Sequence, residues 1–236
     1  MAQKKLIRFA AIKTFSNVLE YPEGMQGCWH THFGNNNPLV LELACGRGEY
    51  TVGLSAFHPE RNFLGVDVKG NRIYIGAKKC LDENRRNAAF LRTQISMLPA
   101  YFAPGEVSEI WLTFPDPQIK PRFARKRLTH PQYLNLYSRF LQPDATLHLK
   151  TDSPRLFHFT RKVIELFGLK LVESQTDVYA AVPRVELNIK TYYEGLDIAG
   201  SNKIFYLCFR IPHNIDFTNT AVLDALKNAE TEFPPT

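Results

Sequence analysis

Short apolar segments alternate with amphipathic segments along most of this chain, and this alternation limits its possible folds more than any other feature. Turn residues bound the apolar segments, as expected of buried parallel strands, which lie at 39–43, 62–68, 88–93, 108–114, 145–150 and 169–174. Between them, apolar residues recur at three- and four-residue spacing, which is typical of helices, at 50–58, 71–84, 131–141 and 153–167. The pattern predicts an α/β fold with a doubly wound, mostly parallel sheet.

The last apolar segment, 203–211, follows a glycine-containing turn with no helix before it. It therefore predicts a final strand that pairs antiparallel. We expect three parts: a polar N-terminal arm over 1–28, one α/β domain over 29–211, and a C-terminal tail over 212–236 with one short helix at 221–229.

Composition narrows the class of protein. Hydrophobic residues make up 44% of the chain and charged residues 22%, as in soluble globular proteins. No apolar run approaches the roughly 18 residues of a membrane span, and the N-terminus lacks the apolar core of a signal peptide. The four cysteines form no CxxC pair and no zinc-like spacing. We expect a cytoplasmic protein in a reducing compartment, without a membrane or metal partner.

The formal net charge is +6. A basic surface favours anionic partners, nucleic acid before a membrane surface. A net charge of this size is equally well explained by ordinary variation among proteins, without any anionic partner.

The first candidate site is ELACGRGEY, residues 42–50, where the first strand ends in a glycine turn. Glycines there allow the backbone to approach a ligand, although Gly46 and Gly48 also suit an ordinary tight turn. Asp67 ends the second strand, at the edge of the sheet where ligands of such folds bind. An acid at that point suits the two hydroxyls of a ribose, and a helix N-cap is the alternative. Together these residues predict a nucleoside ligand.

Two nucleoside cofactors are possible. The dinucleotide fingerprint G-x-G-x-x-G is absent. The stretch E-L-A-C-G-R-G is similar to E/D-x-G-x-G-x-G, the first motif of S-adenosylmethionine (SAM)-dependent methyltransferases, with Ala44 in place of the first glycine. The ammonium and sulfonium groups of SAM are cationic, so carboxylates such as Glu42 suit it. The antiparallel last strand also resembles that superfamily.

The second candidate site is FPDP, residues 114–117, directly after the fourth strand. Its position puts Asp116 at the same cleft, and the two flanking prolines restrict the backbone. A basic run follows, made up of Lys120, Arg122, Arg125, Lys126 and Arg127. Such a cluster suits phosphates, and the interleaved Phe123 suits a sugar or base. An exposed proline-rich turn and a solvated basic loop are the alternatives.

These segments resemble one family, the tRNA (guanine-N7-)-methyltransferases. The resemblance runs from about residue 29 to 210 and rests most on FPDP with its basic run, RKRLTHPQYLNLY (125–137), LHLKTD (147–152) and TYYE (191–194). It implies a SAM cofactor, a tRNA partner, and methyl transfer to N7 of a guanosine that is expected in the variable loop. The sequence does not determine the oligomeric state, which is expected to be a monomer or a homodimer.

The resemblance also implies residue roles. On the cofactor side, Glu42 and the Gly46 turn would hold the methionine part and ribose, Asp67 the ribose hydroxyls, and Gln94 the adenine, with Asp116 also facing the cofactor. Asp116 would be the active-site acid. The residues implied in substrate binding are Lys120, Asp152, Thr191, Tyr192, Tyr193, Glu194, Arg125, Lys126 and Arg127. Ala44, Gln94 and Gln118 depart from the family pattern.

The chemistry needs no general base, because guanine N7 carries a lone pair and no proton. Holding donor and acceptor in line would supply most of the catalysis. A fixed carboxylate would stabilise the positive charge that the purine gains, with Asp116 the first candidate and Asp152 the second. Two rival classes remain: a non-catalytic RNA-binding protein on a methyltransferase fold, and a methyltransferase that acts on another substrate.

Overall fold

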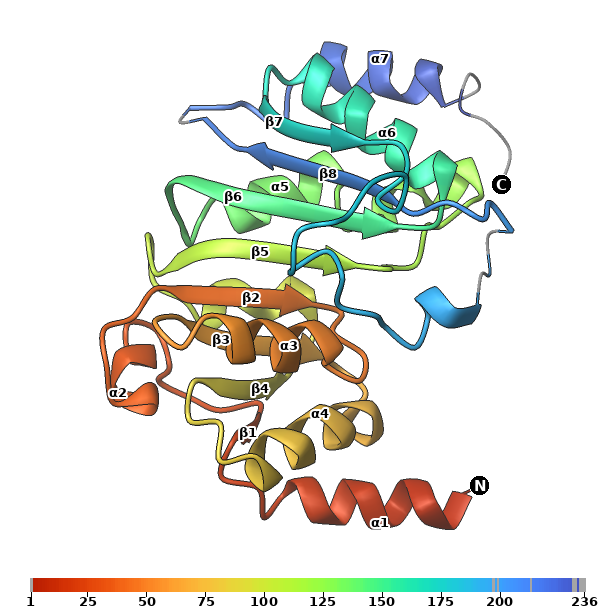
Figure 1. Ribbon diagram of the computed structural model, residues 1–236. Coiled ribbons are helices and arrows are strands. Elements are labelled where there is room, and N and C mark those ends of the chain that lie inside the picture. The colour runs from red at the N-terminus through yellow and green to blue at the C-terminus, as the bar shows by residue number, and fades with distance from the viewer. Residues whose placement is uncertain (1, 197, 199, 213, 231–232, 234–236) are drawn as a thin grey trace.

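One sheet organises the chain in the computed structural model, which describes residues 2–196, 198, 200–212, 214–230 and 233. Within these residues the sheet has eight strands in the order β1-β4-β3-β2-β5-β6-β8-β7 (Figure 1). The strands are β1 (Val18–Glu20), β2 (Leu39–Leu43), β3 (Asn62–Asp67), β4 (Ala88–Arg92), β5 (Val107–Thr113), β6 (Leu141–Thr151), β7 (Lys170–Gln175) and β8 (Phe205–Arg210). Chain order reverses beside β2, and such reversals create ligand sites in open sheets.

The predicted sheet is confirmed. The pairs from β1 through β6 are parallel, and β8 runs antiparallel between β6 and β7. The central strands β2 and β3 are buried almost throughout, which is why most of their residues are apolar on both faces of the sheet.

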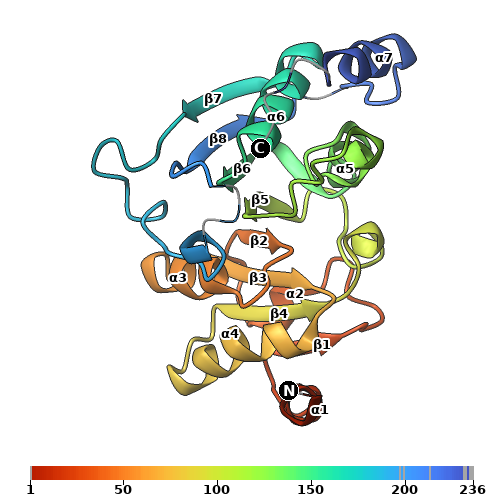
Figure 2. The same ribbon diagram turned by 90° about the vertical axis from the view of Figure 1, so that its right-hand side faces the viewer.

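Helices cover both faces of the sheet, with α3 and α4 on one side and α5 and α6 on the other (Figure 2). The α-helices are α1 (Ala2–Ile12), α2 (Trp29–Phe33), α3 (Glu49–Phe57), α4 (Gly70–Asp82), α5 (Pro131–Tyr137), α6 (Pro154–Leu166) and α7 (Thr220–Ala229). The described residues also form the short 3-10 helices η1 (Ile95–Ala100), η2 (Pro121–Lys126) and η3 (Glu194–Leu196). The Ser153 side chain caps α6 by accepting a hydrogen bond from the amide of Leu156. None of the described helices is both long and apolar enough to cross a bilayer.

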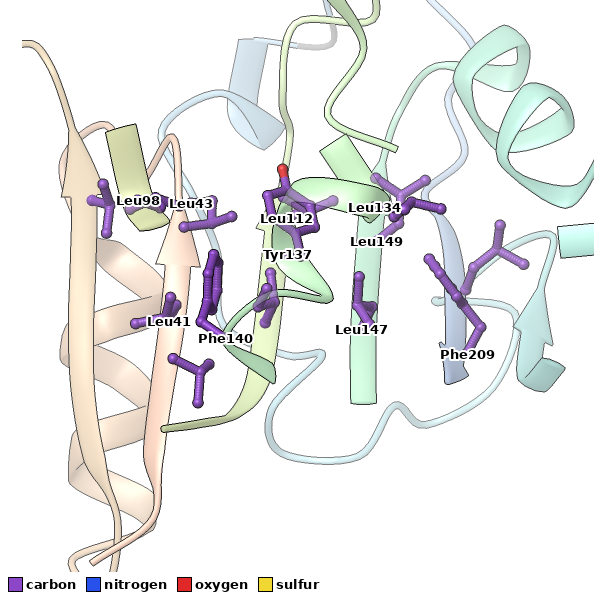
Figure 3. Close-up of a cluster of buried hydrophobic side chains, with 14 of the residues drawn as sticks. Leu41, Leu43, Leu98, Leu112, Leu134, Tyr137, Phe140, Leu147, Leu149 and Phe209 are labelled. Atoms are coloured by element: carbon purple, nitrogen blue, oxygen red, sulfur yellow. The ribbon is translucent and has the colours of Figure 1, made fainter. Parts of the chain in front are cut away.

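The largest core lies between the sheet and the helices on the α5 and α6 side. Strand residues alternate between the two faces, so Leu41 and Leu43 of β2 enter this core while Glu42 between them points to the α3 side. Figure 3 shows the packing of this core around Leu41, Leu43, Leu98, Leu112, Leu134, Tyr137, Phe140, Leu147, Leu149 and Phe209.

The segment expected as an N-terminal arm contains structure that the sequence did not predict. Helix α1 packs against α4, where the fully buried Ile12 lies over Gly70, and strand β1 extends the sheet by pairing with β4. An edge strand of only three residues, all half-buried, has no apolar run that marks it in the sequence. The helix predicted in the C-terminal tail is confirmed as α7, which packs on α6.

Candidate active site

A cavity of about 860 Å³ opens at the carboxyl ends of the parallel strands, the edge that faces the viewer in Figure 2. Five neighbouring strands each contribute a residue at or just after their end: Ala44, Asp67, Thr93, Phe114 and Asp152. Asp67 and Asp116 lie at one cleft as predicted, and the glycine turn reaches the cleft through Ala44, while Gly46 lies behind it and donates its amide to Asp67.

The glycine turn after β2 uses left-handed backbone at alternate positions: φ is 56° at Ala44, 57° at Gly46 and 73° at Gly48. A Cβ on Gly48 would lie 2.4 Å from Phe90, so only glycine fits there. Ala44 lines the cavity in a conformation that usually requires glycine, which explains the glycine at this place in the general motif. The turn brings its backbone directly against the cavity.

Asp67 is held by two backbone amides. One carboxylate oxygen accepts from Gly46 N at 2.9 Å, and the other accepts from Lys69 N at 2.8 Å. Carboxylate oxygens have lone pairs for more than one donor each. The group that lines the cavity is thus preoriented to accept further hydrogen bonds from a ligand.

Glu42 lies elsewhere. It is buried and accepts from Thr51 N, Thr51 Oγ1 and Thr113 Oγ1, at 2.7, 2.6 and 3.1 Å. Burial raises the pKa of this carboxyl to about 7. Glu42 does not line the cavity, and its bonds tie α3 to β2 and β5, so the structure does not support its expected contact with the methionine part of a cofactor.

Asp116 is exposed and lines the cavity from the P-D-P turn. Its Oδ1 accepts from Gln118 N at 3.0 Å, and left-handed φ values of 48° at Phe114 and 46° at Gln118 bound the turn. Asp152 lines the same cavity from the end of β6. Gln94, which precedes η1, also lines it. The cavity thus brings three acids and one amide together.

Of the TYYE segment, Tyr193 alone lines the cavity. Thr191 is buried, and its Oγ1 accepts from Glu194 N at 3.1 Å. The Tyr192 amide donates to Glu49, and the Arg47 guanidinium lies 3.6 Å from the centre of the Tyr192 ring. These contacts fix the loop that carries Tyr193.

Glu194 makes a buried ion pair with Lys150, a residue whose role the sequence did not reveal. The Lys150 ammonium is inaccessible and donates to Glu194 at 2.9 Å and to the carbonyls of Leu187 and Ile189 at 2.8 and 3.1 Å. Burial lowers its pKa to about 8. A lysine inside the apolar run 145–150 was the only sequence signal. Glu194 therefore anchors its loop and does not line the cavity.

The basic run divides in two. Lys120, Arg122, Arg125 and Lys126 are exposed on and beside η2, which follows the cavity-lining Ile119. The Phe123 ring lies 4.9 Å from both the Arg122 and the Lys126 cations. This surface has the composition that RNA phosphates require.

Arg127, by contrast, is completely buried, so its predicted contact with substrate phosphates is wrong. It pairs with Glu230 beyond α7, and it donates to the carbonyls of Pro117 and Gln118 at 3.1 and 3.0 Å. The sequence of the basic run could not show that Arg127 is buried beside an acid of the C-terminal tail, because the residues around it in the run are also basic.

Known proteins match both the fold and the sequence. A family model described as "Putative methyltransferase" matches residues 36–207. The tRNA (guanine-N(7)-)-methyltransferase of Bacteroides thetaiotaomicron is 45% identical over 90% of this chain and 87% of its own. The protein of the same name from Porphyromonas gingivalis is 46% identical over 84% of this chain and 86% of its own.

A solved structure shares the fold at low identity. It is a variant of the 16S rRNA (adenine(1408)-N(1))-methyltransferase of Catenulisporales acidiphilia with its cosubstrate SAM. The TM-score is 0.52 at 13% identity, over 80% of this chain and 92% of that one.

The family model and the curated relatives show that the chain is a methyltransferase, and its fold, with the glycine turn and the cavity at the switch point of the sheet, is the fold of the SAM-dependent class. Within that class, the chain belongs to the tRNA (guanine-N7-)-methyltransferase family.

Proposed function

We propose that this protein transfers a methyl group from SAM to N7 of a guanosine in the variable loop of tRNA, in the cytoplasm, and forms 7-methylguanosine. The observation that carries the proposal is one cavity lined by Asp67 and Asp116, followed in the chain by four exposed cations on and beside η2. The curated relatives of the same family, tRNA (guanine-N(7)-)-methyltransferases by name, support the substrate and the reaction.

The residues of the cavity fit SAM. Asp67 would accept hydrogen bonds from the ribose hydroxyls, the turn at Ala44 would lie against the ligand with Gly46 orienting Asp67, and Gln94 would lie beside the adenine. The carboxylates that line the cavity balance the cationic groups of SAM. When bound, SAM supplies an electrophilic methyl group on its sulfonium.

The chain positions the guanine and does not need to deprotonate it. N7 has a free lone pair, so Asp116 is available to accept from N1–H and the amino group of the base. A carboxylate in a fixed orientation stabilises the positive charge that develops on the purine. Asp152 is the second candidate for this role, and Tyr193 offers a ring at the cavity wall.

One assay separates this function from its rivals. Tritiated methyl from SAM is followed into unmodified bulk tRNA, and the labelled nucleoside is then identified. We expect 7-methylguanosine, mapped by reductive strand cleavage to the variable loop and lost from a transcript with adenosine at that position. Label in another nucleoside, or tRNA binding without any label, contradicts the proposal.

The Asp67→Ala variant tests the cofactor side. We expect SAM affinity to fall by about 1.5–3 kcal/mol, the scale of a lost hydrogen bond to a charged group. Titration calorimetry measures it, and Asp82→Ala serves as the control because Asp82 is an exposed acid on α4 that pairs only with Lys78 among the described contacts. Unchanged affinity in a folded Asp67→Ala protein removes this residue from the cofactor site.

The exposed part of the basic run makes a separate prediction for tRNA binding. Changing Arg122, Arg125 and Lys126 together to alanine should flatten the slope of log K against log salt by roughly 2, because each phosphate contact releases counterions. Arg127 is left intact because it is buried.

Fluorescence anisotropy with labelled tRNA at several salt concentrations measures this slope. The control is the triple alanine change at Lys78, Lys79 and Lys162, which also removes three cations but from α4 and α6. An unaltered slope in the basic-run variant, or the same loss in the control, shows that the run is only a solvated surface.

A further inference from the structure

Arg127 connects the C-terminal tail to the turn that carries Asp116. Its Nε donates to the carbonyl of Pro117 and one Nη donates to the carbonyl of Gln118. The other side of the guanidinium is bound to the Glu230 carboxylate. Because a guanidinium is planar and rigid, its position relative to Glu230 fixes the positions of both carbonyls.

The orientation of Asp116 depends on the same backbone. Its Oδ1 accepts from the amide of Gln118, the residue whose carbonyl Arg127 holds. Gln118 and Phe114 both have left-handed φ, which is unfavourable for residues other than glycine unless neighbours enforce it. The two carbonyl contacts of Arg127 are positioned to enforce it at Gln118.

Glu230 supplies the charge that this arrangement needs. Its carboxylate is buried and shared between Arg127 and Arg155, which donates to it at 3.0 Å from α6. Without that acid, two guanidinium groups would face each other out of contact with water, at a large cost in free energy. Among the described residues, the further hydrogen bonds of Arg155 go to the carbonyls of Glu230 and Phe233 and not to the Asp116 turn.

We propose that Arg127 and Glu230 are positioning residues for methyl transfer: the acid beyond α7 holds Arg127, and Arg127 holds the Asp116 turn in its reactive geometry. This rests on the proposed function. It assigns a catalytic purpose to the C-terminal tail, and it gives Arg127 a different role from the exposed cations next to it.

The test is a double-mutant cycle between Glu230→Gln and Asp116→Asn, read as the single-turnover rate at saturating tRNA and SAM, well below the melting temperature. Alone, Glu230→Gln should slow the reaction roughly tenfold, within the range for residues that share one hydrogen-bond network. In the Asp116→Asn protein, the Glu230→Gln change should slow the reaction by less than about twofold, because the Asp116 carboxylate that Glu230 helps to position is already absent. Equal losses in both backgrounds overturn the proposal.

Arg155→Gln is the matched control, since it removes the other partner of Glu230 and leaves the Asp116 turn untouched. It should lower the melting temperature but keep the rate within about twofold, as expected of a residue with no share in the coupled pair. Glu230→Asp, which keeps the charge, should recover part of the rate. A loss of rate in Arg155→Gln equal to that in Glu230→Gln reduces the role of Glu230 to general stability.

Hydrogen exchange provides a readout that does not depend on activity. Peptides that cover residues 114–120 should exchange faster in Glu230→Gln and not in Arg155→Gln. Unchanged exchange there contradicts the positioning role even if the wild-type protein proves to methylate another substrate. Absence of 7-methylguanosine with the expected exchange pattern would instead reject the proposed function alone.

Discussion

Replacing Lys150 with methionine is expected to lower the free energy of unfolding by about 3–5 kcal/mol, the cost of breaking a buried ion pair by removing one partner. The ammonium is inaccessible, and it is the donor for Glu194 and for the carbonyls of Leu187 and Ile189. Methionine fills the space but donates nothing. A buried carboxylate and two carbonyls would therefore lose their charged partner.

The same change should weaken SAM binding, because the loop that Lys150 anchors carries Tyr193 to the cavity wall. Urea unfolding measures the stability and calorimetry the affinity. Adding Glu194→Gln to Lys150→Met should recover part of the stability, since it removes a buried negative charge that has lost its buried cation and keeps only the exposed Lys190.

Lys190→Met is the control for charge alone. Lys190 binds the same carboxylate at 3.0 Å but is 60% exposed, so its loss should cost less than about 1 kcal/mol. If both lysine variants lose the same stability, the buried position of Lys150 has no special importance.

The sheet was predictable because buried strands leave a direct mark on the sequence. The runs 39–43 and 62–68 are mostly apolar, and they correspond to β2 and β3 with differences of at most one residue at the ends. The antiparallel β8 was predictable for a different reason, since no helix precedes it to make a parallel crossover. Strand β1 was not predictable, because its three residues are too few to form a recognisable apolar run and it is a strand only through its pairing with β4.

The cavity was predictable through strand order, and the buried charges were not. Asp67 ends β3 and Asp116 follows β5, the two strands that flank β2. Because the carboxyl ends of these parallel strands lie at the same edge of the sheet, this topology brings both acids to one cleft. Arg127 pairs with an acid 103 residues away, and Lys150 with one 44 residues away. An arginine has the same charge whether it is buried or solvated, and the residues next to it in the sequence do not distinguish the two. Only the tertiary position of the partner separates the two cases.

Asp116→Asn should slow methyl transfer by roughly 30- to 1,000-fold, or about 2–4 kcal/mol, the scale of one electrostatic catalytic group. Asparagine keeps the size of the side chain, and its Oδ1 still accepts from the Gln118 amide, so the turn should persist. What is lost is the negative charge beside a purine that becomes positive in the transition state. The loss should therefore fall on kcat, with tRNA and SAM affinities nearly intact.

Single-turnover methylation with saturating tRNA and SAM isolates this step. Asp177→Asn is the matched control, because Asp177 also accepts from the amide two residues ahead, at 3.1 Å, but does not line the cavity. It should leave the rate unchanged. Asp152→Asn in the same assay divides the electrostatic role between the two acids of the cavity, because the larger loss identifies the carboxylate nearer to the developing charge. A wild-type rate in Asp116→Asn would leave Asp116 only as a turn residue, and the fixed orientation of its carboxylate would then have no catalytic meaning.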